Sequence, residues 1–175
     1  MIIELEPIFN NVGSRFDFDY SLDLTALNLN SGFPFDSPVA VSGCVKNSAG
    51  VVTLTANVNA VYHSLCDRCA EEIKIPMKIP VEHGIVASLS NEDDGEFIVV
   101  EDMRLNLDAL ITEDVILFVP NKLLCSEKCK GLCPQCGANL NSGQCGCEKP
   151  IDPRLEVLKQ FLDKTAGAED TVSNE

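Results

Sequence analysis

The sequence predicts an α+β protein, with an antiparallel β-rich core, two short helices and a C-terminal cysteine-rich module. Three observations support this. Apolar and polar residues alternate over long stretches, two shorter stretches have helical spacing, and eight of the nine cysteines fall into short pairs. We expect a β-rich domain with one helix over residues 1–120, a module with a helix packed on it over 121–164, and a disordered tail over 165–175.

The first three strands are predicted from alternation with a period of two. Residues 15–24 alternate strictly between apolar and polar side chains, which is typical of a half-buried strand. A second strand begins at Val39, and residues 46–50 have the composition of a hairpin turn. Residues 51–65 then form a long strand with an apolar residue at every even position from 52 to 62.

A fourth long strand is predicted from Ile73 onward, again with a period of two. Pro76 and Pro80 share one of its faces, so we expect it to lie at an edge of the sheet, where a missing N–H costs no ladder hydrogen bond. Residues 88–96 are a polar connector, and residues 97–100 a short apolar strand.

Two helices are predicted from apolar spacing and from their start signals. In the first, Asn106 is the N-cap, apolar residues recur at helical spacing to Phe118, and Pro120 ends the helix. The second begins at Asp152 and Pro153, a cap followed by proline at the first helical position.

The cysteine pairs predict metal binding. An upstream pair, Cys66 and Cys69, falls at the tip of a predicted hairpin, and the others are Cys125, Cys129, Cys133, Cys136, Cys145 and Cys147. Structural zinc takes four ligands as short pairs. A disulfide framework is the alternative, but it needs an oxidising compartment. The N-terminus lacks the basic start of a signal peptide, so we expect a cytoplasmic protein with reduced thiols.

The stronger of the two sets is Cys133, Cys136, Cys145 and Cys147. These four residues can meet by local folding alone, because the chain between the two pairs is rich in glycine and asparagine. Gly137 follows the second cysteine and can take a positive φ, which turns backbone N–H groups toward the sulfurs. We expect at least one zinc site, and two if the remaining cysteines also bind.

The second set joins Cys66 and Cys69 to Cys125 and Cys129, and so would clip two distant parts of the chain together. Three alternatives stay open: the pairs are exchanged between sites, only one site is filled, or the upstream pair is idle. An iron–sulfur cluster also takes four thiolates, but the spacing differs from that of ferredoxins. A thioredoxin-like CxxC opens a helix, whereas a strand follows this one.

The other cysteine and the two histidines are weak candidates for metal binding or catalysis. Cys44 lies within a predicted strand and is expected to be a spectator, and His63 and His83 are read as ordinary polar residues of strands. Both cysteine sets are closed, whereas a catalytic zinc keeps a position for water. Phosphate-binding loops and nucleophile motifs are absent from the sequence, so we expect no enzyme.

The charge of the chain bears on its partners. The formal net charge is −14, and eight ionised thiolates with two zinc ions would make it more negative still. Seven of the thirteen basic residues follow residue 120, near or beyond the cysteines, where they offset thiolate charge or contact RNA. Because the summed field repels phosphate, we favour the first reading and expect little binding of naked RNA.

Several segments resemble the YceD-type family of bacterial proteins. They are Cys66-Asp-Arg-Cys69, the helix from Leu107 to Pro120, the run from Cys129 to Asn141 with Cys145-Gly-Cys147, and Ile151-Asp-Pro-Arg-Leu155. The resemblance covers the chain from about residue 40 and is most specific in the last sixty residues. It implies a role in the accumulation of large-subunit ribosomal RNA, hence in ribosome biogenesis.

Two functions of different kinds follow. The first is a non-enzymatic zinc-binding factor in large-subunit formation that binds a basic ribosomal protein or an assembly intermediate, with no membrane contact. The second is a zinc- or redox-responsive regulatory module that binds another protein, because oxidation of clustered thiolates ejects metal.

Overall fold

The computed structural model describes residues 1–29, 32–88 and 97–147. The chain forms two compact units, Met1–Gly131 and Leu132–Glu175. The first unit therefore includes Cys125 and Cys129, which we expected in the C-terminal module. The helix predicted from Asp152, the tail over 165–175 and nearly all of the connector over 88–96 lie outside the described residues.

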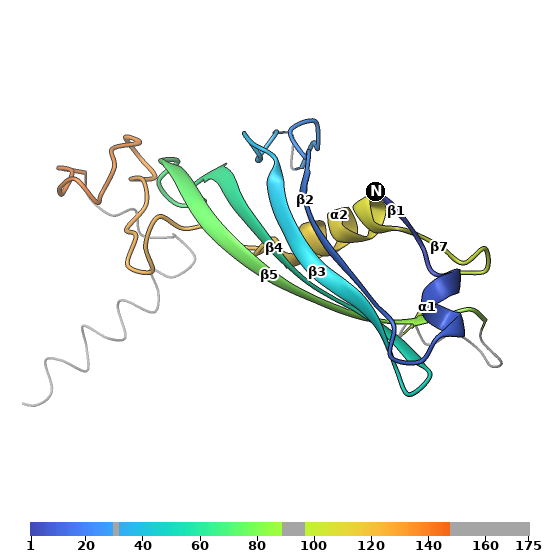
Figure 1. Cartoon of the computed structure of the whole chain (residues 1–175). Coiled ribbons are helices and arrows are strands. Elements are labelled where there is room, and N and C mark those ends of the chain that lie inside the picture. Colours follow the sequence, from blue (N-terminus) through green and yellow to red (C-terminus); the bar gives the residue numbers. More distant parts are fainter. Residues whose placement is uncertain (30–31, 89–96, 148–175) are drawn as a thin grey trace, which may run out of the picture. The chain divides into compact units, whose positions relative to one another are not determined.

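A twisted five-stranded sheet forms the first unit, with the strand order β2-β3-β4-β5-β6 (Figure 1). Its strands are β2 (Arg15–Leu22), β3 (Val39–Ser48), β4 (Val51–Leu65), β5 (Glu72–Val86) and β6 (Phe97–Val99). The first four are antiparallel neighbours, so the antiparallel β-rich core is confirmed. β6 pairs in parallel with the end of β5, over Gly84–Val86, so the sheet is mixed at this edge.

The β3–β4 hairpin is tighter than predicted, because β3 continues to Ser48 and the turn expected over residues 46–50 is shorter. β4 has the bounds predicted for it, and the turn before it consists of Ala49 and Gly50, both with positive φ (55° and 90°). Such two-residue turns match the twist of the flanking strands. Among the described residues, β6 is the only strand on the outer side of β5, so the part of β5 with Pro76 and Pro80 is an edge, as predicted.

One face of the sheet carries the core, and helix α2 (Leu107–Phe118) packs on it (Figure 1). The even-numbered residues of β4 from Val52 to Tyr62 are all buried there, as predicted. The side chain of Asn106 accepts a hydrogen bond from the backbone N–H of Ala109 at 3.3 Å, which confirms the predicted N-cap. Leu107, Ile111 and Val115 form the buried stripe of the helix.

Three short elements of the structure were not predicted from the sequence. They are β1 (Ile2–Glu4), α1 (Glu6–Asn10) and β7 (Arg104–Asn106), and β1 pairs antiparallel with β7. The buried side chain of Asn47 ties α1 to the β3–β4 hairpin, because its Nδ2 donates to the carbonyl of Ile8 at 2.8 Å. Among the described residues, no helix combines the length and apolar character that crossing a membrane requires.

Candidate metal centres

The first cysteine cluster lies where the β4–β5 hairpin meets the loop after α2. The sulfur atoms of Cys66, Cys69, Cys125 and Cys129 all lie within 4.8 Å of one another. The Sγ atoms are 3.8 Å apart for Cys66 and Cys129, and 3.6 Å apart for Cys69 and Cys125. A tetrahedron with zinc–sulfur bonds of about 2.3 Å has sulfur–sulfur edges of about 3.8 Å, whereas a disulfide measures about 2.05 Å. The spacing is therefore that of metal ligands.

The hairpin tip forms the first half of this cluster. β4 ends at Leu65 and β5 begins at Glu72. Between them, the N–H of Cys66 donates to the carbonyl of Glu71 at 2.8 Å, and the N–H of Ala70 donates back to Cys66 at 2.9 Å. The chain thus turns tightly and directs Cys66 and Cys69 to the same point. The pair follows a strand, as the sequence predicted, and does not open a helix.

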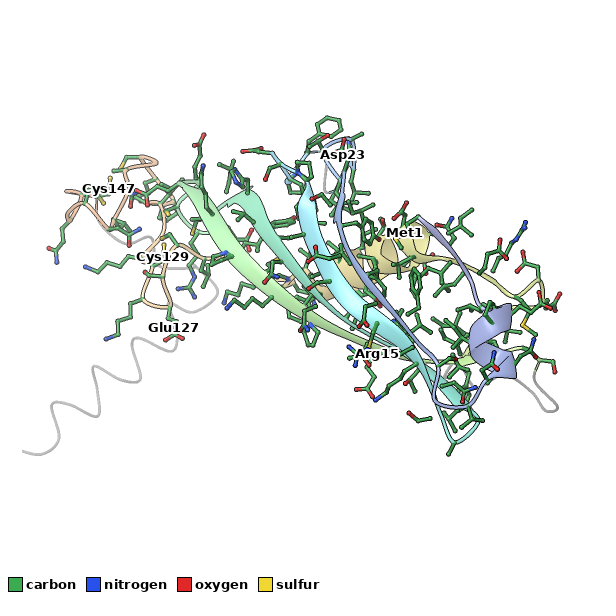
Figure 2. All side chains as sticks on the ribbon, viewed as in Figure 1. Met1, Arg15, Asp23, Glu127, Cys129 and Cys147 are labelled. Atoms are coloured by element: carbon green, nitrogen blue, oxygen red, sulfur yellow. The ribbon has the colours of Figure 1, made fainter. Side chains whose placement is uncertain are left out.

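The second half is held against the tip by contacts that need no metal. Asp67 donates its N–H to the carbonyl of Leu123 at 2.8 Å, and its carboxylate Oδ2 accepts the N–H of Leu123 at 2.6 Å. Arg68 donates through Nη1 to the carbonyl of Cys129 at 2.8 Å. Figure 2 shows Cys129 and the exposed Glu127 in this loop. The two residues between Cys66 and Cys69 therefore recognise the backbone that carries the other pair.

The second cluster forms within the second unit. The sulfurs of Cys133, Cys136, Cys145 and Cys147 also lie within 4.8 Å of one another. Gly137 has a φ of 72° and donates its N–H to the carbonyl of Cys133 at 2.9 Å. Cys133 donates in turn to the carbonyl of Ala138 at 2.8 Å. The positive φ expected of this glycine is therefore present, and both expected groups of four cysteines are brought together.

Electrostatics in the two clusters favour a bound cation. Burial acts to raise the pKa of Cys66, but N–H groups of Cys125, Arg68 and Cys69 outweigh it and lower that pKa to about 6. The N–H groups of Cys136 and Gln135 lower the pKa of Cys133 to about 6. Cys147 moves the other way, because the neighbouring Cys136 sulfur raises its pKa to about 12. The backbone thus stabilises some thiolates, whereas hydrogen bonding to a neighbouring sulfur and burial favour the protonated form of others unless a cation neutralises them.

The donor set decides which metals fit. Four sulfurs suit soft or borderline ions such as zinc, or an iron–sulfur cluster, and are unsuited to magnesium or calcium. Cys66, Cys69, Cys129 and Cys133 are buried, whereas Cys125 and Cys136 are exposed. Both clusters can therefore hold a metal ion with all four positions filled by protein, and each has one solvent-facing edge.

The other candidates lie outside the clusters. Cys44 is half-buried on β3. His63 contacts Asp36 through Nδ1 at 2.6 Å, and His83 contacts Asp114 through Nε2 at 2.9 Å. Neither histidine is among the grouped metal-binding side chains of the described residues. These pairs were not predictable from the sequence, because the carboxylates come from distant segments and no spacing indicates them.

The fold and the two clusters define a class: a β-sheet protein with two four-cysteine centres, one of which joins a hairpin tip to a loop distant in sequence. The chain belongs to the YceD family, because the family model described as "Large ribosomal RNA subunit accumulation protein YceD" matches residues 54–162. The resemblance seen in the sequence is thereby confirmed.

Curated relatives extend this similarity. The chain is 29% identical over 122 residues to uncharacterized proteins of Mycobacterium bovis and Mycobacterium tuberculosis, and the match covers 67% of this chain. It spans 59% of the length of these relatives. No solved structure matches the chain.

Proposed function

We propose that this protein is a non-enzymatic zinc-binding factor that supports the accumulation of large-subunit ribosomal RNA, and that it acts by binding a basic ribosomal or assembly protein. Membership of the YceD family carries the proposal, because the family is described by large ribosomal RNA subunit accumulation. The two four-cysteine clusters supply the metal-binding part.

Zinc is the metal proposed for both clusters. Cys66, Cys69, Cys125 and Cys129 would hold one ion, and the four cysteines of the second unit the other. When bound, zinc neutralises thiolate charge and links the segments that carry its ligands. The ferredoxin spacings that favour iron are absent from this sequence. A site with four protein sulfurs leaves no position for an activated water, which supports a structural role rather than hydrolysis.

Charge supports a protein partner rather than bare RNA. The chain carries 27 acidic and 13 basic residues, so its summed field repels phosphate and attracts a basic surface. Ribosomal proteins are typically basic, because they must neutralise RNA phosphates. An acidic factor can bind such a protein before it reaches RNA, and attraction of this kind weakens as salt rises.

The role in ribosome formation is tested by sedimentation. Cells that lack this protein should show a lower ratio of large to small subunits on a density gradient than cells that contain it. Wild-type protein should restore the ratio, whereas a variant with Cys69→Ser and Cys136→Ser should restore it less. An unchanged ratio in cells that lack the protein would overturn the proposed role.

The choice of partner is tested with purified components. The protein should bind a basic large-subunit ribosomal protein, with an affinity that falls as salt rises, and should bind naked ribosomal RNA poorly. Tight, salt-sensitive binding to free RNA would contradict the proposed partner and would shift the contact to basic residues of the C-terminal part, namely Lys122, Lys128, Lys130 and Arg154.

A second candidate is a redox-responsive binding module, which the exposure of Cys125 and Cys136 favours. With hydrogen peroxide as the oxidant, two thiolates lose two electrons to form one disulfide, the peroxide takes up these electrons with two protons to give two waters, and the metal is released. A chromogenic chelator would detect released zinc. If zinc stays bound under mild peroxide, or if partner binding is unchanged after its release, the regulatory reading fails.

A further inference from the structure

The five-stranded sheet ends at β2 on one side (Figure 1). β2 pairs with β3 over its whole length, and β3 is its only strand partner among the described residues. Within the same part of the chain, no hydrogen bond outside this ladder reaches the backbone of β2. The outer edge of this strand therefore presents a row of unpaired N–H and carbonyl groups, which can bond to a further strand.

The ladder with β3 determines which residues carry these free groups. The N–H of Asn47 donates to the carbonyl of Ser14 at 2.9 Å, just before β2 begins. Because bonds between antiparallel strands recur at every second residue, the even-numbered residues of β2 bond to β3. The odd-numbered residues therefore direct their N–H and carbonyl groups away from the sheet. They are Arg15, Asp17, Asp19 and Ser21.

The opposite edge of the sheet is protected against an added strand. The N–H of Cys66 donates to the carbonyl of Glu71 at 2.8 Å, so the even-numbered residues of β5 face away from β4. Two of these residues are Pro76 and Pro80, which have no N–H to donate. β6 pairs with the end of β5 and occupies the rest of this edge. Prolines at outward positions prevent a continuous ladder from forming here.

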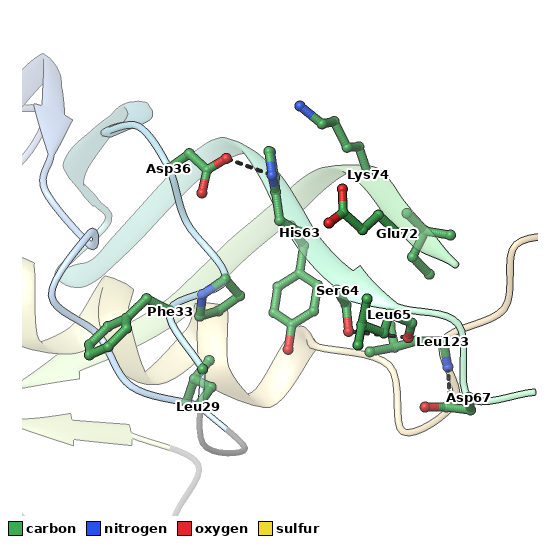
Figure 3. Close-up of a pocket in the computed structure, with 14 residues that line it drawn as sticks. Leu29, Phe33, Asp36, His63, Ser64, Leu65, Asp67, Glu72, Lys74 and Leu123 are labelled. Carbon is green, nitrogen blue, oxygen red and sulfur yellow. Dashed lines mark hydrogen bonds and ion pairs between the residues drawn. The ribbon is translucent and has the colours of Figure 1, made fainter. Parts of the chain in front are cut away.

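The end of β4 continues beyond its pairing with β3 and lines a cleft of about 690 Å³, but the chain's own loop occupies this edge (Figure 3). That loop carries Phe33 and Asp36. The N–H of His63 donates to the carbonyl of Pro34 at 2.8 Å, and its Nδ1 contacts Asp36 at 2.6 Å. Within the described part of the chain, β2 is therefore the long strand whose outward backbone groups are all free.

The core face of β2 offers an apolar contact to an added strand. Phe16 is 41% exposed, although Phe18, the next residue on this face, is buried. The ring of Phe18 packs edge to face against Tyr20, with ring centroids 6.3 Å apart. Phe16 is thus an aromatic side chain at the rim of the core with part of its surface uncovered. An apolar side chain on a neighbouring strand would bury that surface.

The outer face of β2 selects the charge of the added strand. Asp17 is already engaged, because Arg15 contacts its carboxylate through Nη2 at 2.6 Å. Asp19 is exposed, has no ion pair among the described residues and lies opposite Ser42 of β3. A lysine or arginine beside Asp19 would gain a partner, whereas a second copy of this acidic chain is repelled. The edge therefore disfavours self-association and stays available to a basic segment.

We propose that an extended, basic segment of a partner protein binds along β2 as an additional strand of the sheet. Its backbone bonds to the outward groups of Asp17 and Asp19, an apolar side chain packs on Phe16, and a basic side chain faces Asp19. The inference deepens the proposed function: it names the surface that would hold the basic partner, and rests on that function only for the identity of the partner.

The test uses the full zinc-loaded chain and a short capped peptide in which lysine and valine alternate. A peptide with the same residues in two blocks is the control, because it has the same charge but cannot place lysine and valine on opposite faces of a strand. The backbone amide signals of the odd-numbered residues of β2 should shift with the alternating peptide only. The control thereby separates strand addition from general attraction of charge.

Two substitutions at one position separate the backbone from the charge. Asp19→Asn removes the carboxylate and keeps the outward N–H, so it should weaken peptide binding about 2- to 5-fold and lower its salt dependence. Asp19→Pro also removes the N–H, but not a bond to β3, as Pro76 and Pro80 do on β5. It should weaken binding about 10-fold more than Asp19→Asn, while the amide signals of β3 stay unchanged.

A second pair of variants tests the apolar contact without touching the backbone. Phe16→Ala should weaken peptide binding about 5-fold or more, as expected for an aromatic anchor of an interface. Phe118→Ala is the control, because Phe118 is 47% exposed and lies at the end of α2. Equal binding by these two variants would contradict the proposed contact.

Three further results would overturn the inference: equal shifts with the block peptide, equal affinities of Asp19→Asn and Asp19→Pro, or shifts of β2 amides on dilution without peptide, which would show a second copy at the edge. Its failure is separable from that of the proposed function. If Asp19→Pro and Phe16→Ala lose peptide binding but restore the subunit ratio in cells, the edge still binds basic strands, and its link to ribosome formation is contradicted. If wild-type protein restores the ratio without binding the alternating peptide, the function stands and the edge inference fails.

Discussion

Asp67 and Leu123 hold each other by two hydrogen bonds, although 56 residues separate them in the sequence. The backbone N–H of Asp67 reaches the Leu123 carbonyl at 2.8 Å, and the Leu123 N–H reaches the Asp67 carboxylate at 2.6 Å. This contact lies between the two halves of the first cysteine cluster and uses no cysteine. The hairpin tip and the loop after α2 are therefore aligned by these hydrogen bonds as well as by the cysteines, and such contacts lower the entropy cost of assembling the site.

Replacing Asp67 tests this alignment. Asp67→Ala removes the carboxylate and leaves the part-buried N–H of Leu123 without its acceptor, which should cost about 1–3 kcal/mol of local stability. Hydrogen exchange at Leu123 should accelerate, and the affinity of the first cluster for zinc should fall. Asp23→Ala is the matched control, because within the described part of the chain the Asp23 carboxylate bonds only to Thr25 in its own exposed turn. Unchanged exchange at Leu123 would show that the contact adds nothing.

Cysteine substitutions distinguish the two clusters. Binding of metal to a structural site contributes on the order of 10 kcal/mol to folding of the segment around it. Cys136→Ser should therefore unfold the segment from Leu132 to Cys147 and leave the sheet protected from hydrogen exchange. Cys69→Ser should instead expose the loop from Cys125 to Cys129. If Cys69→Ser left that loop as protected as before, the grouping of the ligands would be wrong.

Gly43 on β3 should be intolerant of a side chain. A Cβ atom placed there would lie 2.3 Å from the carbonyl oxygen of Thr55 and 2.8 Å from the Cβ of Ala56. β3 and β4 cannot move apart at this point without losing backbone hydrogen bonds between them. Gly43→Ala should therefore lower the free energy of unfolding, measured by urea titration, by about 1–3 kcal/mol. Gly143→Ala is the control, because nothing lies within 4 Å of its Cβ position. Equal midpoints for the two variants would contradict this packing.

Tyr20 should make stability depend on pH in the alkaline range. Its hydroxyl is buried, and burial together with the neighbouring Asp108 carboxylate raises its pKa well above the ordinary value of about 10. The unfolded chain therefore ionises first, and the contribution present below about pH 10 is lost as pH rises further. Tyr20→Phe should flatten this decline in stability at little cost at neutral pH. An unchanged alkaline slope would contradict the assignment.

The long elements were predictable from sequence, because their signals repeat. β4 was predicted with its observed bounds, since its apolar alternation runs over many residues, and α2 was predicted because Asn106 and Pro120 mark its two ends. β1, β7 and α1 were missed. Strands of three residues are too short to show a period, and their pairing brings together residues about one hundred positions apart.

The cysteine clusters were predictable for a different reason. Closely spaced cysteines that form no disulfide usually bind a metal ion. Residue type and spacing alone therefore indicated the two clusters. The contacts of Asp67 and the cleft at the end of β4 could not be predicted. Leu123, Phe33 and Asp36 reach their positions only through tertiary packing, and none of them carries a recognisable motif.

The central claim is that the eight clustered cysteines form two structural zinc sites. Native mass spectrometry of protein purified without chelator tests it most directly, because it counts metal ions on each intact chain and identifies them by mass. We predict two zinc ions on the wild-type chain, and one on each of the variants Cys69→Ser and Cys136→Ser. One zinc on the wild-type chain, or iron in place of zinc, would contradict the claim.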